Sequence, residues 1–393
     1  MPEGADPNEP SDAVGSAPAS EPAGRIVRFV GERAVVVESR PVPPPGPGEV
    51  RVRTEVSAIS PGTELLVYRG NAPESMAADT SIDALSGDLS FPLSYGYAAV
   101  GRVTALGDGV DESWRDRRVF AFHPHESHFL AAPEDLLPVD LSPTTAALLP
   151  NAETAVNFAL DGEARVGERV AVFGQGVVGL LTTALLSAYP LDRLVALDLH
   201  DRRRRLARAF GADTTVDPRD GSLEGTSLPL SDDLTGRETA ASATDAESAG
   251  GDRRRDPAVR RLYEGVSPPA GMDLALELSG SPDALDQAIA ATGYAGRVLV
   301  GSWYGRKRVD LDLGRRFHRS RVQVRSSQVS TVDPRLRGRW DDDRRLSVTR
   351  DWLADTPVER LVTHRLPVGD AADAYRLLDE HPDEAVGVVF TYD

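Results

Sequence analysis

The chain has 393 residues, 40% of them hydrophobic, and it contains no cysteine. This length exceeds what one hydrophobic core usually supports and predicts two domains, while the lack of cysteine excludes disulfides, thiolate zinc sites and thiol nucleophiles. A formal net charge of −17 disfavours nucleic acid as a partner. It favours a cytoplasmic protein from a salt-loving cell, because salt screens the repulsion within such an acidic surface; an acidic protein from an ordinary cell is the alternative.

The chain starts with an acidic, proline-rich stretch, residues 1–23, which has neither the basic nor the apolar segment of a targeting signal. We expect it to be a disordered tail. From Arg25 the residues alternate between apolar and polar around a Gly-Glu turn, which predicts a hairpin, and strand patterns dominate to about Asp140. Helical spacing follows in 141–160. The longest apolar run, 170–188, is interrupted by glycines, so no membrane span is expected.

Alternating strands and helices mark the middle of the chain. Residues 169–216 read as strand, glycine turn, apolar helix, strand, charged helix and short strand, the rhythm of a parallel sheet covered by helices. The small and charged stretch at about 219–256 predicts a flexible acidic insertion. Strand and helix patterns resume from Met272, and the part from Thr331 onward predicts one amphipathic helix, 371–380, and a closing strand.

A glycine-rich turn provides the strongest motif. Gly174, Gly176 and Gly179 form G-x-G-x-x-G directly after a predicted strand, and Val177 opens the predicted helix. The first glycine permits a tight turn, the second lets a pyrophosphate approach the main chain, and the third lets the helix pack on the strand. Main-chain N–H groups and the helix dipole then favour phosphate. We predict a dinucleotide site at these four residues.

Asp198 is the residue expected to decide between NAD and NADP. It ends the next strand, close to the spacing of roughly twenty residues after the glycines at which a carboxylate accepts the ribose hydroxyls. A carboxylate there repels a 2′-phosphate, which favours NAD over NADP. Arg202 and Arg203 favour the opposite choice, since an arginine contacts a 2′-phosphate when the loop bends toward it. Arg203 is therefore among the predicted cofactor contacts.

Five segments together resemble the medium-chain dehydrogenase/reductase superfamily, whose members are similar to zinc alcohol dehydrogenase. They are VSAISPGTE, FPLSYGYAAVGRVTALGDGV, RRVFAF, VGERVAVFGQGVVG and ALELSGSPDALDQAIAATGYAGRVLVGSWYG. The resemblance implies an α/β fold with a GroES-like β-rich catalytic domain, 24–150 and 331–393. It also implies a Rossmann domain with a doubly wound parallel sheet that binds NAD, 151–330, and a substrate between the two domains.

Two further implications follow from the same resemblance. The superfamily implies a homodimer formed by sheet extension, through the strand near Val298 to Ser302. The short segments ISPGTE and FHRSRVQVRSSQVS look most like the hydroxyethyl-bacteriochlorophyllide dehydrogenase branch, which implies oxidation of a secondary alcohol with NAD.

The departures from the superfamily concern its metal. Zinc-dependent members carry a cysteine ligand near the position of Ser60 and a His-Glu pair at the positions of Tyr97 and Ala98, and they add a lobe with four cysteines around a structural zinc. The sequence carries other residues at these positions and no cysteine. A tetrahedral zinc at the usual place would lack its ligands, so the resemblance predicts a zinc-free member.

Hydride transfer without a Lewis acid still needs a group that polarises the oxygen or moves its proton. Tyr97 is the first candidate, Thr63 resembles the hydroxyl of the superfamily's proton relay, and Ser60 stands nearby. The alternative is that Tyr97 packs as an aromatic ring beside a glycine turn and that Ser60 belongs only to a turn.

A histidine cluster offers a second chemistry. The segment FHPHESHF contains His123, His125 and His128. Three interpretations stay open: a relocated metal site, an acid-base role, and packing in a loop or at a sheet edge. We favour His128 for the cleft, because the comparable segment of the superfamily runs beside the substrate.

The sequence therefore predicts a zinc-independent oxidoreductase that moves a hydride between NAD(H) and an alcohol or carbonyl compound. Its predicted catalytic residues are Tyr97, Thr63, Ser60 and His128, and no metal ligand is predicted. Three alternatives remain: an NADPH-dependent quinone or enone reductase, a metal-dependent dehydrogenase that uses the histidines, and a noncatalytic dinucleotide-binding protein.

Overall fold

The computed structural model describes residues 23–78, 82, 84–219, 223–224 and 271–392. The predicted acidic tail, apart from its last residue, and most of the predicted insertion lie outside these described residues. Among the described residues, no helix has both the length and the apolar character needed to cross a membrane.

One mixed sheet joins the two ends of the described chain. Its order is β15-β16-β3-β4-β5-β7, with β6 paired to β3. The strands are β3 (Val50–Ala58), β4 (Ala99–Leu106), β5 (Arg118–Ala121), β6 (His128–Ala131), β7 (Leu137–Pro138), β15 (Val362–Pro367) and β16 (Gly387–Thr391). Because β16 pairs antiparallel with β3, the last strand completes a sheet that the first half of the chain begins. This is the GroES-like domain.

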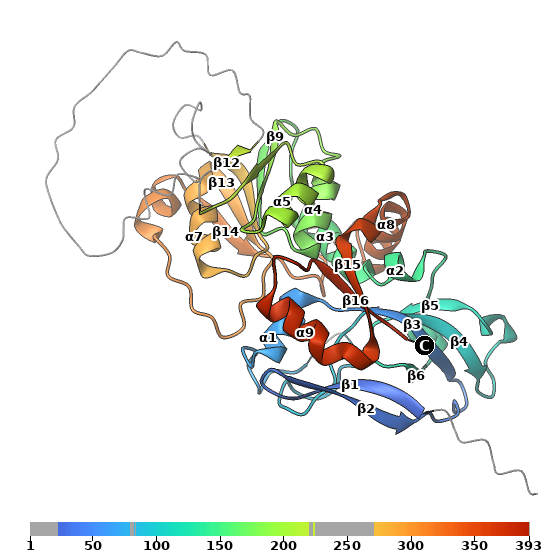
Figure 1. Ribbon diagram of the computed structural model, residues 1–393. Helices are drawn as coiled ribbons and strands as arrows, with labels where there is room; N and C mark the ends of the chain where they lie inside the picture. Colours follow the sequence, from blue (N-terminus) through green and yellow to red (C-terminus); the bar gives the residue numbers. More distant parts are fainter. Residues whose placement is uncertain (1–22, 79–81, 83, 220–222, 225–270, 393) are drawn as a thin grey trace, which may run out of the picture.

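A hairpin and two helices pack on this sheet. Strands β1 (Ala23–Gly31) and β2 (Ala34–Pro41) pair antiparallel, so the predicted hairpin is confirmed. Helix α1 (Pro61–Tyr68) begins with a proline in its first turn, where no intrahelical N–H bond is lost. Helix α9 (Ala371–Glu380) contacts α1 and β2, as the red and blue ribbons of Figure 1 show.

The second sheet is parallel except at one edge. Its order is β11-β10-β9-β8-β12-β13-β14, and only the β10–β11 pair is antiparallel. The strands are β8 (Arg169–Phe173), β9 (Arg193–Leu197), β10 (Thr214–Val216), β11 (Leu223–Glu224), β12 (Met272–Glu277), β13 (Thr292–Val300) and β14 (Gln323–Ser326). The strand order reverses between β8 and β12, so the carboxyl ends of these two strands form the switch point at which Rossmann domains bind ligands.

Six further helices complete the described fold. They are α2 (Pro143–Ala146), α3 (Leu149–Gly162), α4 (Val177–Leu186), α5 (Asp201–Ala209), α7 (Pro282–Ala291) and α8 (Asp342–Asp355). Helix α3 packs against α4 and α8, and α7 packs against β12 and β13. The alternation predicted for 169–216 is confirmed. The predicted domain limits at residues 150 and 331 stay a prediction.

Helix α8 was not among the predicted elements. The sequence analysis expected one helix after Thr331, whereas the structure has α8 as well as α9. The buried positions of α8 are Arg345, Thr349 and Leu353, spaced four residues apart on one face. Two of these three side chains are polar, so the apolar periodicity that reveals an amphipathic helix is absent.

The strand suggested for sheet extension lies inside its sheet. Strand β13 pairs with β12 on one side and with β14 on the other. It therefore has no unpaired edge to offer a second chain, and the suggestion that a dimer forms through Val298 to Ser302 is wrong in this respect. Strand β14 is the last strand of the described sheet on that side.

The two domains share one apolar core. A single cluster of buried residues includes Val56 and Phe120 of the first sheet, Leu149 of α3, and Leu180 and Ala196 of the Rossmann domain. This continuity fixes the loops that follow β3 and precede β4 relative to α3, and it is these segments that carry the candidate site.

Candidate active site

Three hydroxyl groups meet beside the first turn of α1. Ser60 is the residue that precedes this helix, Thr63 lies in its first turn, and Tyr97 follows Gly96 before β4 begins. The Tyr97 hydroxyl lies 2.6 Å from Ser60 Oγ and 3.3 Å from Thr63 Oγ1. The structure thus brings together three of the four side chains that the sequence analysis selected for catalysis.

The Ser60 main chain is held by a side chain from the first turn of the helix, because the Glu64 carboxylate accepts a hydrogen bond from the Ser60 main-chain N–H at 2.6 Å. A serine at this position usually accepts a hydrogen bond from an N–H of the first turn, but no side-chain cap bond is formed here. The Ser60 Oγ instead interacts with Tyr97.

Asn151 is a further member that sequence reasoning missed. It lies in α3, it is buried, and its Nδ2 donates to Ser60 Oγ over 3.3 Å. The sequence signal was an amide within the otherwise apolar stretch ALLPNA, since a buried amide requires a partner. A helix next to the Rossmann domain therefore supplies a donor to the cluster.

The three histidines of FHPHESHF lie in different surroundings. His125 is fully buried, with Nε2 lying 3.0 Å from Glu64 Oε2 and Nδ1 lying 2.7 Å from Ser57 Oγ. The His123 ring stacks on Phe129 with the ring centroids 4.0 Å apart, and burial lowers the pKa of His123 to about 4. In the described part of the chain, no three side chains of His, Cys, Asp or Glu are grouped so as to hold a metal.

His128 is placed away from the hydroxyl cluster. It lies in β6 opposite Arg53 of β3, and its Nδ1 lies 3.0 Å from Ser127 Oγ. Arg53 precedes Ser60 along an extended segment, at roughly 20 Å by the rise of a strand. The pairing of β6 with the first half of β3 therefore sends His128 to the other end of the strand, and the expectation that it lines the same site as Tyr97 needs correcting.

The donor set near Ser60 does not fit a zinc ion. The positions that carry ligands in zinc-dependent members hold the Ser60 hydroxyl, the Tyr97 phenol and the Ala98 methyl, none of them a usual zinc ligand. The nearby groups of suitable chemistry, His125 and Glu64, bond to each other and are both fully buried. The groups that remain around Ser60 are hydroxyls and an amide.

The glycine turn after β8 has the geometry of a dinucleotide site. A methyl group added at Gly174 would lie 2.7 Å from the Ser279 main chain, and one added at Gly179 would lie 2.0 Å from the Gly174 carbonyl oxygen. At Gly176, by contrast, no atom lies within 4 Å of such a methyl. The outer glycines thus permit close packing, while the space over Gly176 and the N-terminal end of α4, starting at Val177, fits a pyrophosphate.

Asp198 is held beside this turn by main-chain donors. Its Oδ2 accepts from the Gln175 N–H at 2.7 Å, and its Oδ1 accepts from the His200 N–H at 2.8 Å. The carboxylate is nearly buried, and Arg203 Nη1 lies 3.9 Å from its Oδ2. A carboxylate fixed at the end of β9, next to the glycine turn, fits the contact with ribose hydroxyls.

The two arginines after Asp198 reach across to the other domain. Arg202 donates to the Glu384 carbonyl at 2.8 Å, and Arg203 donates to the carbonyls of Pro382 and Ala385 at 2.8 and 3.1 Å. These bonds tie α5 to the segment that precedes β16. In this arrangement part of each guanidinium is committed to main-chain acceptors.

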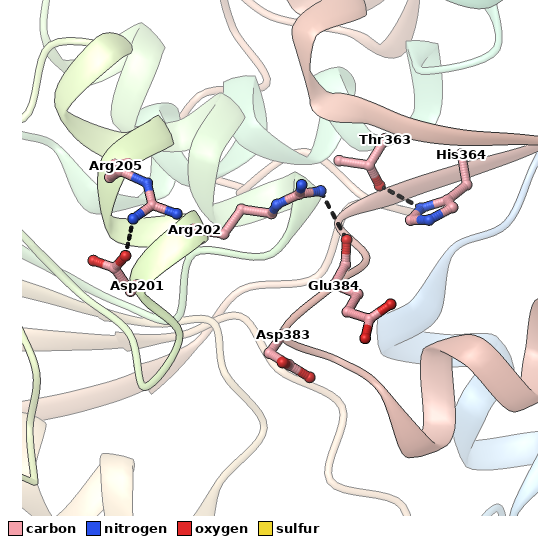
Figure 2. Close-up of a pocket in the computed structure, with 7 residues that line it drawn as sticks. All are labelled: Asp201, Arg202, Arg205, Thr363, His364, Asp383 and Glu384. Atoms are coloured by element: carbon pink, nitrogen blue, oxygen red, sulfur yellow. Dashed lines mark hydrogen bonds and ion pairs between the residues drawn. The ribbon is translucent and has the colours of Figure 1, made fainter.

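A polar cavity of about 540 Å³ lies beside this link. Figure 2 shows its lining, which consists of Asp201, Arg202 and Arg205 of α5, Thr363 and His364 of β15, and Asp383 and Glu384. Arg205 pairs with Asp201, Arg202 with the Glu384 carbonyl, and His364 with Thr363. The lining includes neither the hydroxyl cluster nor the glycine turn, so we place the chemistry at those two features and not in this cavity.

The GroES-like and Rossmann domains together define the fold of medium-chain dehydrogenases/reductases. A family model described as "Zinc-binding dehydrogenase" matches residues 177–343. The solved structure of a short chain alcohol dehydrogenase from E. coli CFT073, complexed with NADH, superposes with a TM-score of 0.67 at 16% identity and covers 94% of this chain and 99% of that chain. The predicted fold class is confirmed.

Two curated relatives extend the similarity to named activities. (R,R)-butanediol dehydrogenase of Bacillus subtilis (strain 168) is 26% identical over 309 residues, 71% of this chain and 78% of that protein. L-threonine 3-dehydrogenase of Xanthomonas euvesicatoria pv. vesicatoria (strain 85-10) is 22% identical over 389 residues, 90% of this chain and 96% of that protein. The family model and these relatives support an oxidoreductase of the zinc-binding dehydrogenase family within the medium-chain superfamily.

Proposed function

We propose that the protein transfers a hydride between NAD(H) and a secondary alcohol or ketone, and that hydroxyl groups act on the substrate oxygen without zinc. The observation that carries this proposal is the cluster of Tyr97, Ser60 and Thr63, with Asn151 as a fourth polar group. The resemblance implies that zinc-dependent members carry metal ligands at the positions of Ser60 and Tyr97, and the fold and relatives of this chain support a dehydrogenase.

The proposed reaction divides between the cofactor and the hydroxyl cluster. Bound NADH supplies the hydride that reduces a ketone carbon. The Tyr97 hydroxyl donates a proton to the ketone oxygen, the Ser60 hydroxyl at 2.6 Å stabilises the phenolate that is left, and a proton from solvent restores the phenol after the alcohol departs. Thr63 at 3.3 Å offers a second hydrogen bond to the same phenol. Alcohol oxidation runs through the same groups in reverse, with Tyr97 starting as the phenolate that accepts the alcohol's proton.

The preference for NAD rests on Asp198 and on the partners of the arginines. The carboxylate lies at the end of β9, where it accepts ribose hydroxyls and repels a 2′-phosphate. Arg202 and Arg203 donate to carbonyls of the other domain and so have fewer donors left for a phosphate. We therefore propose NAD as the cofactor.

A fluorescence titration with NADH, and in parallel with NADPH, tests the cofactor. It is run in high salt with a chelator present. Tight NADH binding with weak NADPH binding supports the proposal. Asp198→Ala should then bring the Kd for NADH and the Kd for NADPH closer together. A preference for NADPH favours the quinone or enone reductase instead. If neither dinucleotide binds the folded protein, the dehydrogenase proposal fails.

Turnover measurements test the role of the hydroxyl cluster. 2,3-Butanediol and L-threonine, the substrates named for the relatives, are the first probes, followed by other secondary alcohols and ketones. Tyr97→Phe should lower kcat by about a hundredfold, the usual size of a general acid-base contribution. Tyr95→Phe is the matched control, because it removes a buried hydroxyl, 3.4 Å from the Ala78 carbonyl, two residues away. Equal activity of the two variants would contradict the proposed role of Tyr97.

A further inference from the structure

A fully buried pair of charged or polar side chains lies behind the hydroxyl cluster. Glu64 accepts hydrogen bonds from the Ser60 N–H at 2.6 Å, from the Tyr375 hydroxyl at 2.5 Å and from His125 Nε2 at 3.0 Å. Both Glu64 and His125 have no solvent-exposed area. A buried carboxylate is costly unless several donors satisfy it, and this one has three.

The hydrogen bonds continue from His125 to two further side chains. Because Nε2 faces a carboxylate, which only accepts, it carries a hydrogen. His125 Nδ1 lies 2.7 Å from the Ser57 hydroxyl, whose oxygen lies 2.7 Å from the Tyr392 hydroxyl. Both ring nitrogens of His125 therefore have a partner, so the imidazole has a single favoured orientation.

The order Ser57, His125 and Glu64 resembles that of a hydrolytic triad, but burial excludes this chemistry. The Ser57 side chain has no exposed area, so no substrate reaches its hydroxyl. In a triad, moreover, the serine must present its oxygen to a reacting carbonyl beside an oxyanion site. Ser57, His125 and Glu64 must therefore act through the residues that they contact and not on a substrate.

One connection leads from the pair to Ser60. Glu64 Oε1 accepts from the Ser60 main-chain N–H at 2.6 Å and so fixes the main chain from which the Ser60 hydroxyl projects. If the Glu64 carboxylate were lost, this buried N–H would lose its partner, and the main chain that aims the Ser60 hydroxyl at Tyr97 would no longer be held.

A second and independent connection leads from the pair to Tyr97. Gly96 has a φ of +108°, and a methyl group added there would lie 2.6 Å from His125 Cδ2 and Nε2. The imidazole therefore lies directly against the main chain of the residue that precedes Tyr97. The main-chain N–H of His125 also approaches the Tyr95 carbonyl, with the nitrogen 3.5 Å from the oxygen. The histidine thus supports the turn from which the phenol projects.

We propose that His125 and Glu64 are positioning residues that together set the hydrogen bond between Tyr97 and Ser60. The pair contacts both partners of that bond by separate routes: Glu64 fixes Ser60, and His125 supports the turn of Tyr97. The use of this bond in hydride transfer rests on the proposed function, whereas its geometry does not. His125, unlike His128, is then the histidine of FHPHESHF that serves the site.

The test measures the surroundings of Tyr97 directly. Tyrosine labelled with 13C at Cζ gives one signal for each of the nine tyrosines, and Tyr97→Phe identifies the signal of Tyr97 by its loss. His125→Ala should shift or broaden that signal, and Glu64→Gln should do the same. His123→Ala is the matched control, since it removes another histidine from the same segment whose ring stacks on Phe129. It should leave the Tyr97 signal in place.

Turnover gives the second readout. On 2,3-butanediol, or the best probe found, His125→Ala should lower kcat by about tenfold or more while KM and the Kd for NADH change by less than about twofold. His125→Gln keeps an N–H donor and should recover part of the loss; it also replaces His125→Ala if that variant does not fold. An unchanged Tyr97 signal in folded His125→Ala and His125→Gln would overturn the proposal. Failure of the wild type to bind NADH would instead contradict the proposed function, because the Tyr97 signal is measured without cofactor.

Discussion

Two glycines of the same turn should respond to alanine in opposite ways. Gly179 lies in α4, and a methyl group there would be 2.0 Å from the Gly174 carbonyl oxygen. That oxygen belongs to the main chain of a turn at which Gly174 has a φ of +91°, and the turn also packs against Ser279, so it has little room to move. Gly176 has an extended conformation, with no atom within 4 Å of the added methyl.

The magnitudes follow from these distances. Alanine gains about 1 kcal/mol over glycine inside a helix, whereas overpacking against an immobile atom costs about 1–3 kcal/mol and at times more. For a contact as short as that at Gly179, the clash should exceed the gain, so Gly179→Ala should lower the free energy of unfolding by about 1–3 kcal/mol. Gly176→Ala should change it by less than about 0.5 kcal/mol, yet raise the Kd for NADH at least about tenfold, because the methyl occupies the space that fits the pyrophosphate.

Thermal unfolding and NADH titration of both variants provide the assay. Gly179→Ala should lower the midpoint by several degrees, at about 2–4 °C per kcal/mol for domains of this size. Gly176→Ala should melt like the wild type and bind NADH weakly. A Gly176→Ala variant that binds NADH as the wild type does would refute the placement of the phosphates, and a Gly179→Ala variant of full stability would refute the packing argument.

Three ionisable side chains, those of Glu126, His123 and Arg345, give further predictions. Burial raises the pKa of Glu126 to about 7, against the opposing effect of Arg40. The Glu126 carboxyl therefore ionises at a lower pH in the unfolded chain than in the folded one, and the free energy of unfolding should fall by about 3 kcal/mol between pH 4.5 and 7. Glu126→Gln should remove this slope in pH-dependent denaturation. Burial lowers the pKa of His123 to about 4, so the free energy of unfolding should fall by about 3 kcal/mol as the pH drops from 6.5 to 4, and His123→Gln should abolish that fall. Arg345, buried in α8, donates to Glu153 at 3.0 Å; Arg345→Met should cost about 3–5 kcal/mol in urea unfolding, and adding Glu153→Leu should recover most of it. An Arg345→Met variant as stable as the wild type would contradict this account of the Arg345–Glu153 ion pair.

The fold could be predicted where burial produces a simple apolar pattern. Strands β8, β9 and β12 are apolar along most of their length because helices cover the sheet, and the glycine turn marks the start of α4. Helix α8 was not predicted because its buried face contains two polar side chains, Arg345 and Thr349, and the partner of Arg345 lies far away in the sequence. Periodicity reports only burial that is apolar.

The site could be predicted only as far as its local motifs extend. Ser60, Thr63 and Tyr97 stand in short segments that resemble a known superfamily, and the structure brings their hydroxyls together. Asn151 and His125 acquire their roles from tertiary packing, which no local pattern records. The choice between two histidines of one segment depended on strand register, because the pairing of β6 with β3 decides which of them lies near α1.

The bonds between α5 and the segment before β16 have side-chain donors on one side and main-chain acceptors on the other. Arg202 and Arg203 donate to carbonyl oxygens at positions 382, 384 and 385. Every residue type has such an oxygen, so substitution at those three positions leaves the acceptors in place, whereas substitution of either arginine removes donors. Related sequences should therefore tolerate substitution at positions 382 and 384 while keeping the path of the segment, whereas Ala385 is fully buried and is constrained by packing. The hydrogen bonds themselves constrain only the two arginines of the helix.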